Sequence, residues 1–317
     1  MNRTVLVALA ASAALFAGAA SAQQAQAPAP APNPAPFIDW EKVQIKTTDL
    51  GHNTYRLEGQ GGNITIAVGT DGIIMVDGQF APLSAKIKAA IAAISPLPVK
   101  YLINTHFHGD HTGGNENFAK DGAIIVAQEN IKTRLANGSS PNGITGAKQP
   151  AQPAAALPKE TYVDGTKTLQ VGGRTALLTH TPHAHTDGDT WVYFADANVI
   201  STGDTSNNTK KYQTVDFANG GDIRGMIAAN EAFLKMGNDD TKYVVGHGPL
   251  AKKADVQEFH DMLVTARDRI EKLIKEGKSE AEVVEMRPLA DLDAKWAVND
   301  SNAVAFTRMV YNSFKRS

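Results

Sequence analysis

The stretch THFHGDHTGG, residues 105–114, decides which kind of protein this chain encodes. It follows the apolar run VKYLIN directly, so its histidines emerge where an expected β-strand gives way to a loop. His106 and His108 are two residues apart, and extended backbone points both imidazoles the same way. Gly109 allows a turn that can aim Asp110 and the histidine after it elsewhere. This spacing predicts a metal site, because four fixed positions would match by accident on the order of once in a million windows.

The ligand types restrict the metal. The 317 residues contain no cysteine, which excludes disulfides, thiolate nucleophiles and zinc–thiolate sites. Any metal must therefore be held by His, Asp or Glu. Imidazole and carboxylate ligands without sulfur favour zinc, with iron or manganese as alternatives.

Three later segments place further candidate ligands where strands are expected to end. In HAHTDGD either His183 or His185 can face the metal, Asp204 ends the run ISTGD, and His247 lies between two glycines in YVVGHG. A dinuclear site needs six or seven ligands from several directions, and strand ends that converge on one edge can supply them.

The remaining pattern predicts an α/β protein in which helices cover a sheet. Helical spacing of apolar residues appears from Leu83 to Ile94 and from Val256 to Leu273. Runs typical of strands are Asn63–Ala67, Gly72–Val76, Val99–Asn104, Ala123–Val126, Thr175–His180, Thr190–Phe194, Asn198–Ser201 and Lys242–Val245. Residues 137–158, rich in Gly, Pro, Ser and Ala, are expected to form one long loop.

The amino-terminal region predicts export. Arg3 precedes an apolar run, and Ala20-Ser21-Ala22 offers the small residues of a signal-peptidase site, so residues 1–22 are interpreted as a cleaved signal peptide. Residues 23–36 alternate Ala and Pro and are expected to form a linker. Residues 37–317 would then form one large domain, in a periplasmic or secreted protein without stable membrane association after cleavage.

The charge balance argues against two classes of binding partner, nucleic acids and anionic membranes. With 31 Lys and Arg against 33 Asp and Glu, the net charge is −2. This gives no basic excess for binding nucleic acid and no polybasic stretch for binding an anionic bilayer. A small-molecule substrate is the expected partner.

These motifs resemble those of the metallo-β-lactamase superfamily, which run in the order Asp, H-x-H-x-D-H, His, Asp, His. The matching positions are Asp77, residues 106–111, His185, Asp204 and His247. The resemblance covers about residues 50–249. It implies a four-layer αββα sandwich with the metals at one edge of two facing sheets, and it favours His185 over His183.

The resemblance also implies roles for these residues. His106, His108 and His185 would hold one metal, Asp110, His111 and His247 would hold the other, and Asp204 would bridge them. Asp77 would brace the metal loop without binding metal, although a turn aspartate after a strand is an equally good interpretation.

The implied reaction is hydrolysis of an ester, lactone, thioester, amide or β-lactam by a hydroxide bound to two zinc ions, with Asp110 as the catalytic residue that orients it. The carboxylate at position 204 resembles the metal sites of glyoxalase II and lactonases. A secretory signal, by contrast, favours a β-lactamase. Two alternatives remain: a periplasmic zinc-binding accessory protein, for example of a quinoprotein maturation system, and a glyoxalase II-like thioesterase.

Substrate contacts are the least determined part of the sequence. Lys210, Lys211 and Tyr212 follow Asp204 by six to eight residues and are the candidates for binding a substrate carboxylate, although solvated loop charges are the commoner explanation for such lysines. The glycine-rich turn at residues 59–62 and the loop at residues 137–158 are further candidate walls of the site.

Overall fold

The computed structural model describes residues 38–315, together with Met1. The expected signal peptide and linker, residues 1–36, lie outside the described residues apart from Met1. From Ile38 onward the chain belongs to one compact unit with two β-sheets and flanking helices. Within the described residues, no helix combines the length and the apolar character needed to cross a bilayer.

The first sheet has its strands in sequence order, from β1 to β7. Its first four strands are antiparallel neighbours, whereas β4, β5, β6 and β7 are parallel. The carboxyl ends of these parallel strands therefore meet at one edge. The strands are β1 (Lys46–Gly51), β2 (Thr54–Glu58), β3 (Ile64–Val68), β4 (Ile73–Val76), β5 (Val99–Ile103), β6 (Ile124–Gln128) and β7 (Glu160–Tyr162).

The second sheet has the order β12–β11–β10–β9–β8. Its strands pair antiparallel except β11 and β12, which are parallel. Both of these strands therefore end at the same edge of the sheet. The strands are β8 (Thr166–Val171), β9 (Arg174–His180), β10 (Thr190–Phe194), β11 (Val199–Gly203) and β12 (Lys242–Val245).

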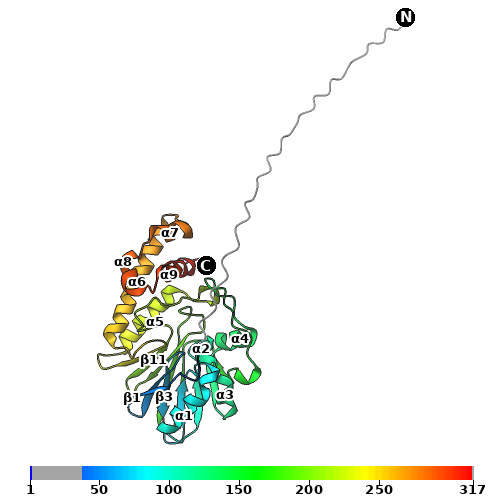
Figure 1. Ribbon diagram of the computed structural model, residues 1–317, viewed down its shortest axis with the longest axis vertical. Helices are drawn as coiled ribbons and strands as arrows, with labels where there is room; N and C mark the ends of the chain where they lie inside the picture. The colour runs from blue at the N-terminus through cyan, green and yellow to red at the C-terminus, as the bar shows by residue number, and fades with distance from the viewer. Residues whose placement is uncertain (2–37, 316–317) are drawn as a thin grey trace. The chain divides into compact units, whose positions relative to one another are not determined.

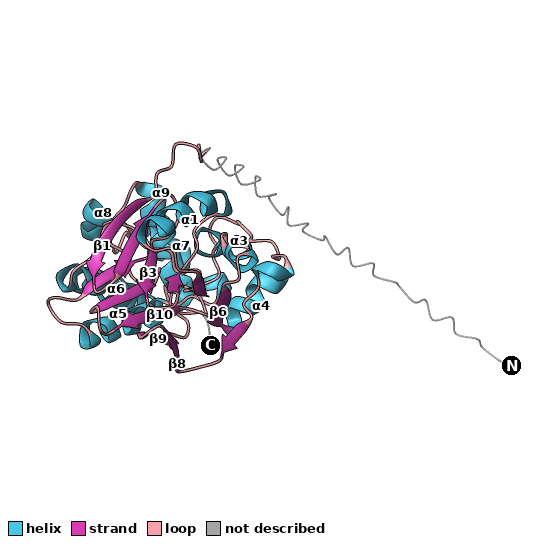
Figure 2. Cartoon of the chain, turned by 90° about the horizontal axis from the view of Figure 1, so that it is seen from below, coloured by secondary structure: helices cyan, strands magenta, loops and turns pink. Residues whose placement is uncertain are grey.

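Helices cover the outer faces of both sheets (Figures 1 and 2). In Figure 1 the cyan to green helices α1, α3 and α4 lie on one side of the strands, and the yellow to red helices α5 to α9 lie on the other. The helices are α1 (Ser84–Ile94), α2 (Gly109–Thr112), α3 (Asn115–Lys120), α4 (Glu129–Asn137), α5 (Ile223–Met236), α6 (Lys253–Lys275), α7 (Glu280–Met286), α8 (Ala290–Trp296) and α9 (Asp300–Ser313).

Strand β4 shows why the layers form. Its residues are all buried, and they alternate between two cores because successive side chains of a strand point to opposite faces. Ile74 and Val76 pack between the sheets, whereas Ile73 and Met75 pack toward α1 and α3. The predicted four-layer αββα sandwich is confirmed.

The sequence pattern predicted eight of the twelve strands among the described residues and missed β1, β2, β7 and β8. The eight predicted strands all occur, with ends that differ by up to two residues. The edge strands β1 and β8 were missed because their sequences, KTTDLG and TKTLQV, are polar and largely exposed. The strand β7 has only three residues, and β2, with the sequence TYRLE, is short and carries polar residues at three of its five positions. Their hydrogen-bonded neighbours stabilise them as strands, and a local pattern does not contain those neighbours.

Candidate metal centre

The candidate ligands lie at the carboxyl ends of strands from both sheets. His106 and His108 follow β5, with the short helix α2 placing the next aspartate and histidine one turn later. Asp204 follows β11 directly, and His247 follows β12 after one glycine. His185 lies in the loop between β9 and β10. Both sheets thus deliver polar side chains to one edge of the sandwich.

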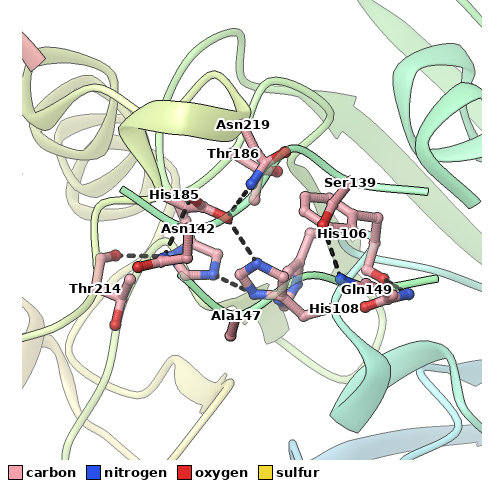
Figure 3. Close-up of polar contacts among 12 residues, drawn as sticks. His106, His108, Ser139, Asn142, Ala147, Gln149, His185, Thr186, Thr214 and Asn219 are labelled. Carbon is pink, nitrogen blue, oxygen red and sulfur yellow. Dashed lines mark hydrogen bonds and ion pairs between the residues drawn. The ribbon is translucent and has the colours of Figure 1, made fainter. Parts of the chain in front are cut away.

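One group of ligand atoms is formed by His106, His108 and His185, whose nitrogens lie within 4.8 Å of one another. Nε2 of His185 is 3.0 Å from Nδ1 of His108. Figure 3 shows the three rings side by side. His183, the alternative to His185, instead places its Nδ1 3.1 Å from the backbone oxygen of Gly220.

A second group consists of Asp110, His111 and His247, again within 4.8 Å. Oδ2 of Asp110 is 3.2 Å from Nε2 of His247 and 3.6 Å from Nε2 of His111. Asp204 lies between the two groups. Its Oδ1 is 3.2 Å from Nε2 of His111, and its Oδ2 is 3.7 Å from Nε2 of His185.

The atoms that face this centre fit a metal better than they fit one another. Nε2 of His106, Nε2 of His111 and Oδ1 of Asp204 are buried and have no hydrogen-bond partner, since the 3.2 Å contact between the last two atoms is not aligned as a hydrogen bond. An unpaired buried polar atom costs about 1–3 kcal/mol, and here such atoms cluster among other donors. Nitrogen and carboxylate oxygen are also the ligands that zinc accepts, so the residues present fit divalent cations.

The other nitrogen of each ring is held by the surrounding protein. Nδ1 of His185 lies 2.8 Å from the backbone oxygen of Thr214, and Nδ1 of His106 lies 3.1 Å from Oγ1 of Thr105. Nε2 of His108 lies 3.1 Å from Oδ2 of Asp216. Such contacts set the tautomer and the orientation of a metal-binding imidazole, so the rings are oriented before any metal binds.

The sequence matches the family model of the metallo-beta-lactamase superfamily over residues 48–248, which is more than half of the chain. The chain belongs to this superfamily. Most members are hydrolases, and the His/Asp clusters of this metallo-β-lactamase superfamily member suggest that it binds divalent metal.

Individual relatives are distant. The chain is 24% identical to the Beta-lactamase-like protein 2 homolog of Caenorhabditis elegans over 259 residues, which are 80% of this chain and 78% of that protein. It is 28% identical to the 2,4-dinitroanisole O-demethylase subunit alpha of Nocardioides sp. (strain JS1661) over 144 residues, covering 44% of this chain and 40% of that protein.

Solved structures share the fold at low identity. A metallo-beta-lactamase from Pontibacter korlensis has a TM-score of 0.58 and 17% identity, covering 70% of this chain and 99% of that chain. The stereoselective inverting sec-alkylsulfatase Pisa1 from Pseudomonas sp. has a TM-score of 0.62 and 15% identity, covering 85% of this chain and 50% of that chain.

Electrostatics divide four of the five candidate ligand histidines of this superfamily member into two pairs. Burial lowers the pKa of His185 to about 4 and, together with the nearby His111, holds the pKa of His106 well below its usual value. The carboxylate of Asp204 raises the pKa of His247 to about 10. Burial alone would lower the pKa of His111, but Asp204 and the other nearby carboxylates raise it well above its usual value.

The two pairs differ in the direction of their pKa shifts. The lowered pKa values favour neutral rings in His106 and His185, whereas the raised values favour protonated rings in His111 and His247, beside the carboxylates. Divalent cations bound here would compete with those protons, so metal affinity is expected to depend on pH.

Asp77 follows β4 in left-handed backbone, with a φ of 62°. Its carboxylate accepts hydrogen bonds from the backbone N–H and Oγ1 of Thr105, both at 2.8 Å, and lies 2.8 Å from Nδ1 of His111. Asp77 is thus a turn residue that also contacts a candidate ligand, and its role in bracing the metal loop stays a prediction.

A cavity of about 460 Å³ opens beside the centre. His108, Asp110 and Phe80 line it on one side, and residues 139–152 line the other, as expected for a wall formed by the long loop. Among the described residues, neither Lys210, Lys211 nor Tyr212 belongs to this lining.

The structure gives two of those three residues other partners. Lys210 forms ion pairs with Asp255 and Glu258, and the buried Tyr212 donates its hydroxyl to Asp293.

Sequence reasoning missed several residues around the centre. Gln213 donates to Oδ2 of Asp204 at 3.1 Å, and Asp216 contacts His108 as described above. Neither lies in a recognisable motif, and both approach the centre through a long loop after β11. No local signal in TVDFANGG distinguishes Asp216 from an ordinary loop aspartate.

Proposed function

We propose that the protein is a hydrolase that uses two zinc ions to cleave an ester, lactone, amide or β-lactam bond. The observation that carries this proposal is the convergence of seven His and Asp side chains, several with unpaired buried ligand atoms, at one edge of the sandwich. Iron or manganese would suit the same donor types, so elemental analysis has to identify the metal.

The proposed ligand sets follow the two groups of atoms. His106, His108 and His185 would hold one ion, and Asp110, His111 and His247 would hold the other. Asp204 would contact both, which is supported by the short distances from its two oxygens to histidines of both groups.

Bound zinc would supply a hydroxide nucleophile at neutral pH and would polarise the scissile carbonyl. Asp110 contributes the chain's own part of this chemistry. Its close contacts to His111 and His247 both involve Oδ2, and the residue lines the cavity. In this proposal the other carboxylate oxygen, Oδ1, would accept a hydrogen bond from the attacking water and orient it.

The cavity supports a small-molecule substrate, because its volume matches the usual range for such sites. Export to the periplasm or medium is part of the proposal, supported by residues 1–22 of the sequence. A nucleic-acid partner is not expected from a net charge of −2.

A substrate panel tests the proposal. The purified chain should contain about two equivalents of metal and hydrolyse at least one of nitrocefin, a homoserine lactone, p-nitrophenyl acetate or S-lactoylglutathione. The names of two similar proteins add 2,4-dinitroanisole and a secondary alkyl sulfate to the panel. A metal-loaded chain with no rate above the metal-free blank on any of them would favour the accessory-protein role.

Asp110→Asn is expected to lower the turnover of whichever substrate responds by about a hundredfold or more, because an amide neither balances the cations nor accepts a proton. Asp121→Asn, at an exposed position after α3, serves as the control and should keep full turnover. Steady-state kinetics and circular dichroism on both variants check this. A folded Asp110→Asn variant with wild-type turnover would show that water is oriented by another group.

A further inference from the structure

The segment that forms one wall of the cavity is tied down at its two ends. In this wall segment, residues 139–149, the backbone N–H of Ser139 donates to the backbone oxygen of Gln149 at 3.0 Å. The side chain of Gln149 donates to the backbone oxygen of Phe107, directly before His108, at 2.8 Å. Figure 3 shows Ser139 and Gln149 beside the rings of the centre.

A buried asparagine outside the wall segment binds it at a second point. Asn219 is only 1% exposed. Its Oδ1 accepts from the backbone N–H of Ser140 at 2.8 Å, and its Nδ2 donates to the backbone oxygen of the same residue at 3.1 Å. Nη1 of Arg134 donates to the same Oδ1 at 2.8 Å. Arg134 is itself fixed by a bidentate ion pair with Asp187.

The second amide hydrogen of Asn219 connects this residue to the metal centre through Asp216. Nδ2 donates to Oδ2 of Asp216 at 2.9 Å, which completes the hydrogen-bonding capacity of the amide. The same Oδ2 lies 3.1 Å from Nε2 of His108. A carboxylate only accepts, so Nε2 carries the hydrogen and Nδ1 keeps its lone pair for the centre.

We propose that Asn219 is a positioning residue that couples the substrate wall, residues 139–149, to the metal-binding orientation of His108 through the shared oxygen of Asp216. The inference rests on the proposed function in one respect, that the group of three histidines binds a cation. The coupling acts in both directions. A change that makes the wall segment more mobile lowers the affinity for the metal, and metal bound at His108 makes the wall segment less mobile.

Asn219→Ala removes all four hydrogen bonds. We expect its affinity for Zn²⁺, measured by competition with a chromogenic chelator, to fall by about tenfold, as for other contacts behind a ligand. We also expect amide hydrogen exchange in residues 139–149 to become faster and to lose its dependence on Zn²⁺. In the wild-type chain, Zn²⁺ should slow that exchange.

Two further variants separate positioning from general stability. Asn115→Ala is the matched control, because this buried amide also binds backbone and side chain, at Ala156 and Asn104, without touching the wall segment or Asp216. It should lower the melting temperature and leave Zn²⁺ affinity unchanged. Asn219→Asp keeps the shape of the side chain and its contact to Arg134, but it cannot donate to Asp216. If Asn219→Ala does not fold, Zn²⁺ affinity and hydrogen exchange are measured on this variant instead.

Three results would each overturn the proposal: wild-type Zn²⁺ affinity in a folded Asn219 variant, an equal loss of affinity in Asn115→Ala, or exchange in residues 139–149 of the wild-type chain that does not respond to Zn²⁺. Turnover is not a readout here. A chain that binds Zn²⁺ with this coupling and hydrolyses nothing would refute the proposed function and support the coupling.

Discussion

Gly62 lies so close to the ring of His111 that a β-carbon would clash with it. Glycine at position 62 therefore has a steric reason. The backbone N–H of Gly62 also donates to the backbone oxygen of Asp110 at 3.0 Å. Gly62→Ala should push the ring out of place and cost about 1–3 kcal/mol of unfolding free energy, as overpacking does. Metal content should fall at the same time.

Gly109→Ala is the matched control for this change. A β-carbon there meets only Oε1 of Gln149, at an ordinary 3.6 Å. Thermal unfolding and metal analysis of both variants check the prediction, and equal behaviour of the two would contradict the steric explanation.

Asp189 makes stability depend on pH. Its carboxyl is fully buried and accepts from the backbone N–H and Oγ1 of Thr186, and burial raises its pKa from 3.8 to about 8. Between these values the folded state keeps a proton that the unfolded state has lost. The stabilisation is therefore complete below about pH 4 and is lost as the pH rises toward about 8.

Asp189→Asn cannot ionise and should lack this part of the pH dependence. Denaturant unfolding of both chains at about pH 5 and about pH 8 measures it, with the wild type losing stability relative to the variant as the pH rises. A constant difference would show that the carboxyl is already ionised at about pH 5.

The carboxy-terminal helices support the loop that surrounds the metal centre. Tyr212 of that loop stacks on Phe306 of α9 with ring centroids 4.1 Å apart, and the backbone N–H of Val215 donates to the sulfur of Met309. Thr214 and Asp216, which orient two histidines, lie between or beside these contacts. Elements outside the matched family region thus position the site.

Phe306→Ala should cost about 3–5 kcal/mol of unfolding free energy, because a fully buried ring leaves a cavity. It should also weaken metal binding, since it frees the segment that carries Thr214. Phe314→Ala, at a partly buried position at the end of α9, should lower the unfolding free energy by less and leave the metal affinity unchanged. Metal affinity that is unchanged in Phe306→Ala would mean that the loop holds its shape without α9.

The metal should contribute to the stability of the whole molecule. Its ligands come from β5, β11, β12 and the loop after β9, so the complete set exists only in the folded state. At free zinc about 1,000 times the dissociation constant, the gain is about 4 kcal/mol. Calorimetry with zinc and after chelation checks this, and an unchanged melting temperature would contradict metal binding by the folded state.

Much of the centre was predictable because its densest part is local. The six residues from His106 to His111 carry four candidate ligands, and their spacing alone indicates a strand end followed by a turn. The choice between His183 and His185 was not local. Asp216 and Asn219 were not predictable either, since they contact His108 and the wall segment only after chain folding brings distant loops together.

The amino-acid sequence alone determined the donor chemistry, with histidine and carboxylate but no thiolate, and it determined the buried strands whose alternating apolar residues need two cores. Only the tertiary structure decided which side chains face the centre and which, like Lys210 and Tyr212, find partners elsewhere. The physical reason is that donor type and strand periodicity are properties of short segments, whereas the meeting of β5, β11 and β12 at one edge depends on how two sheets pack.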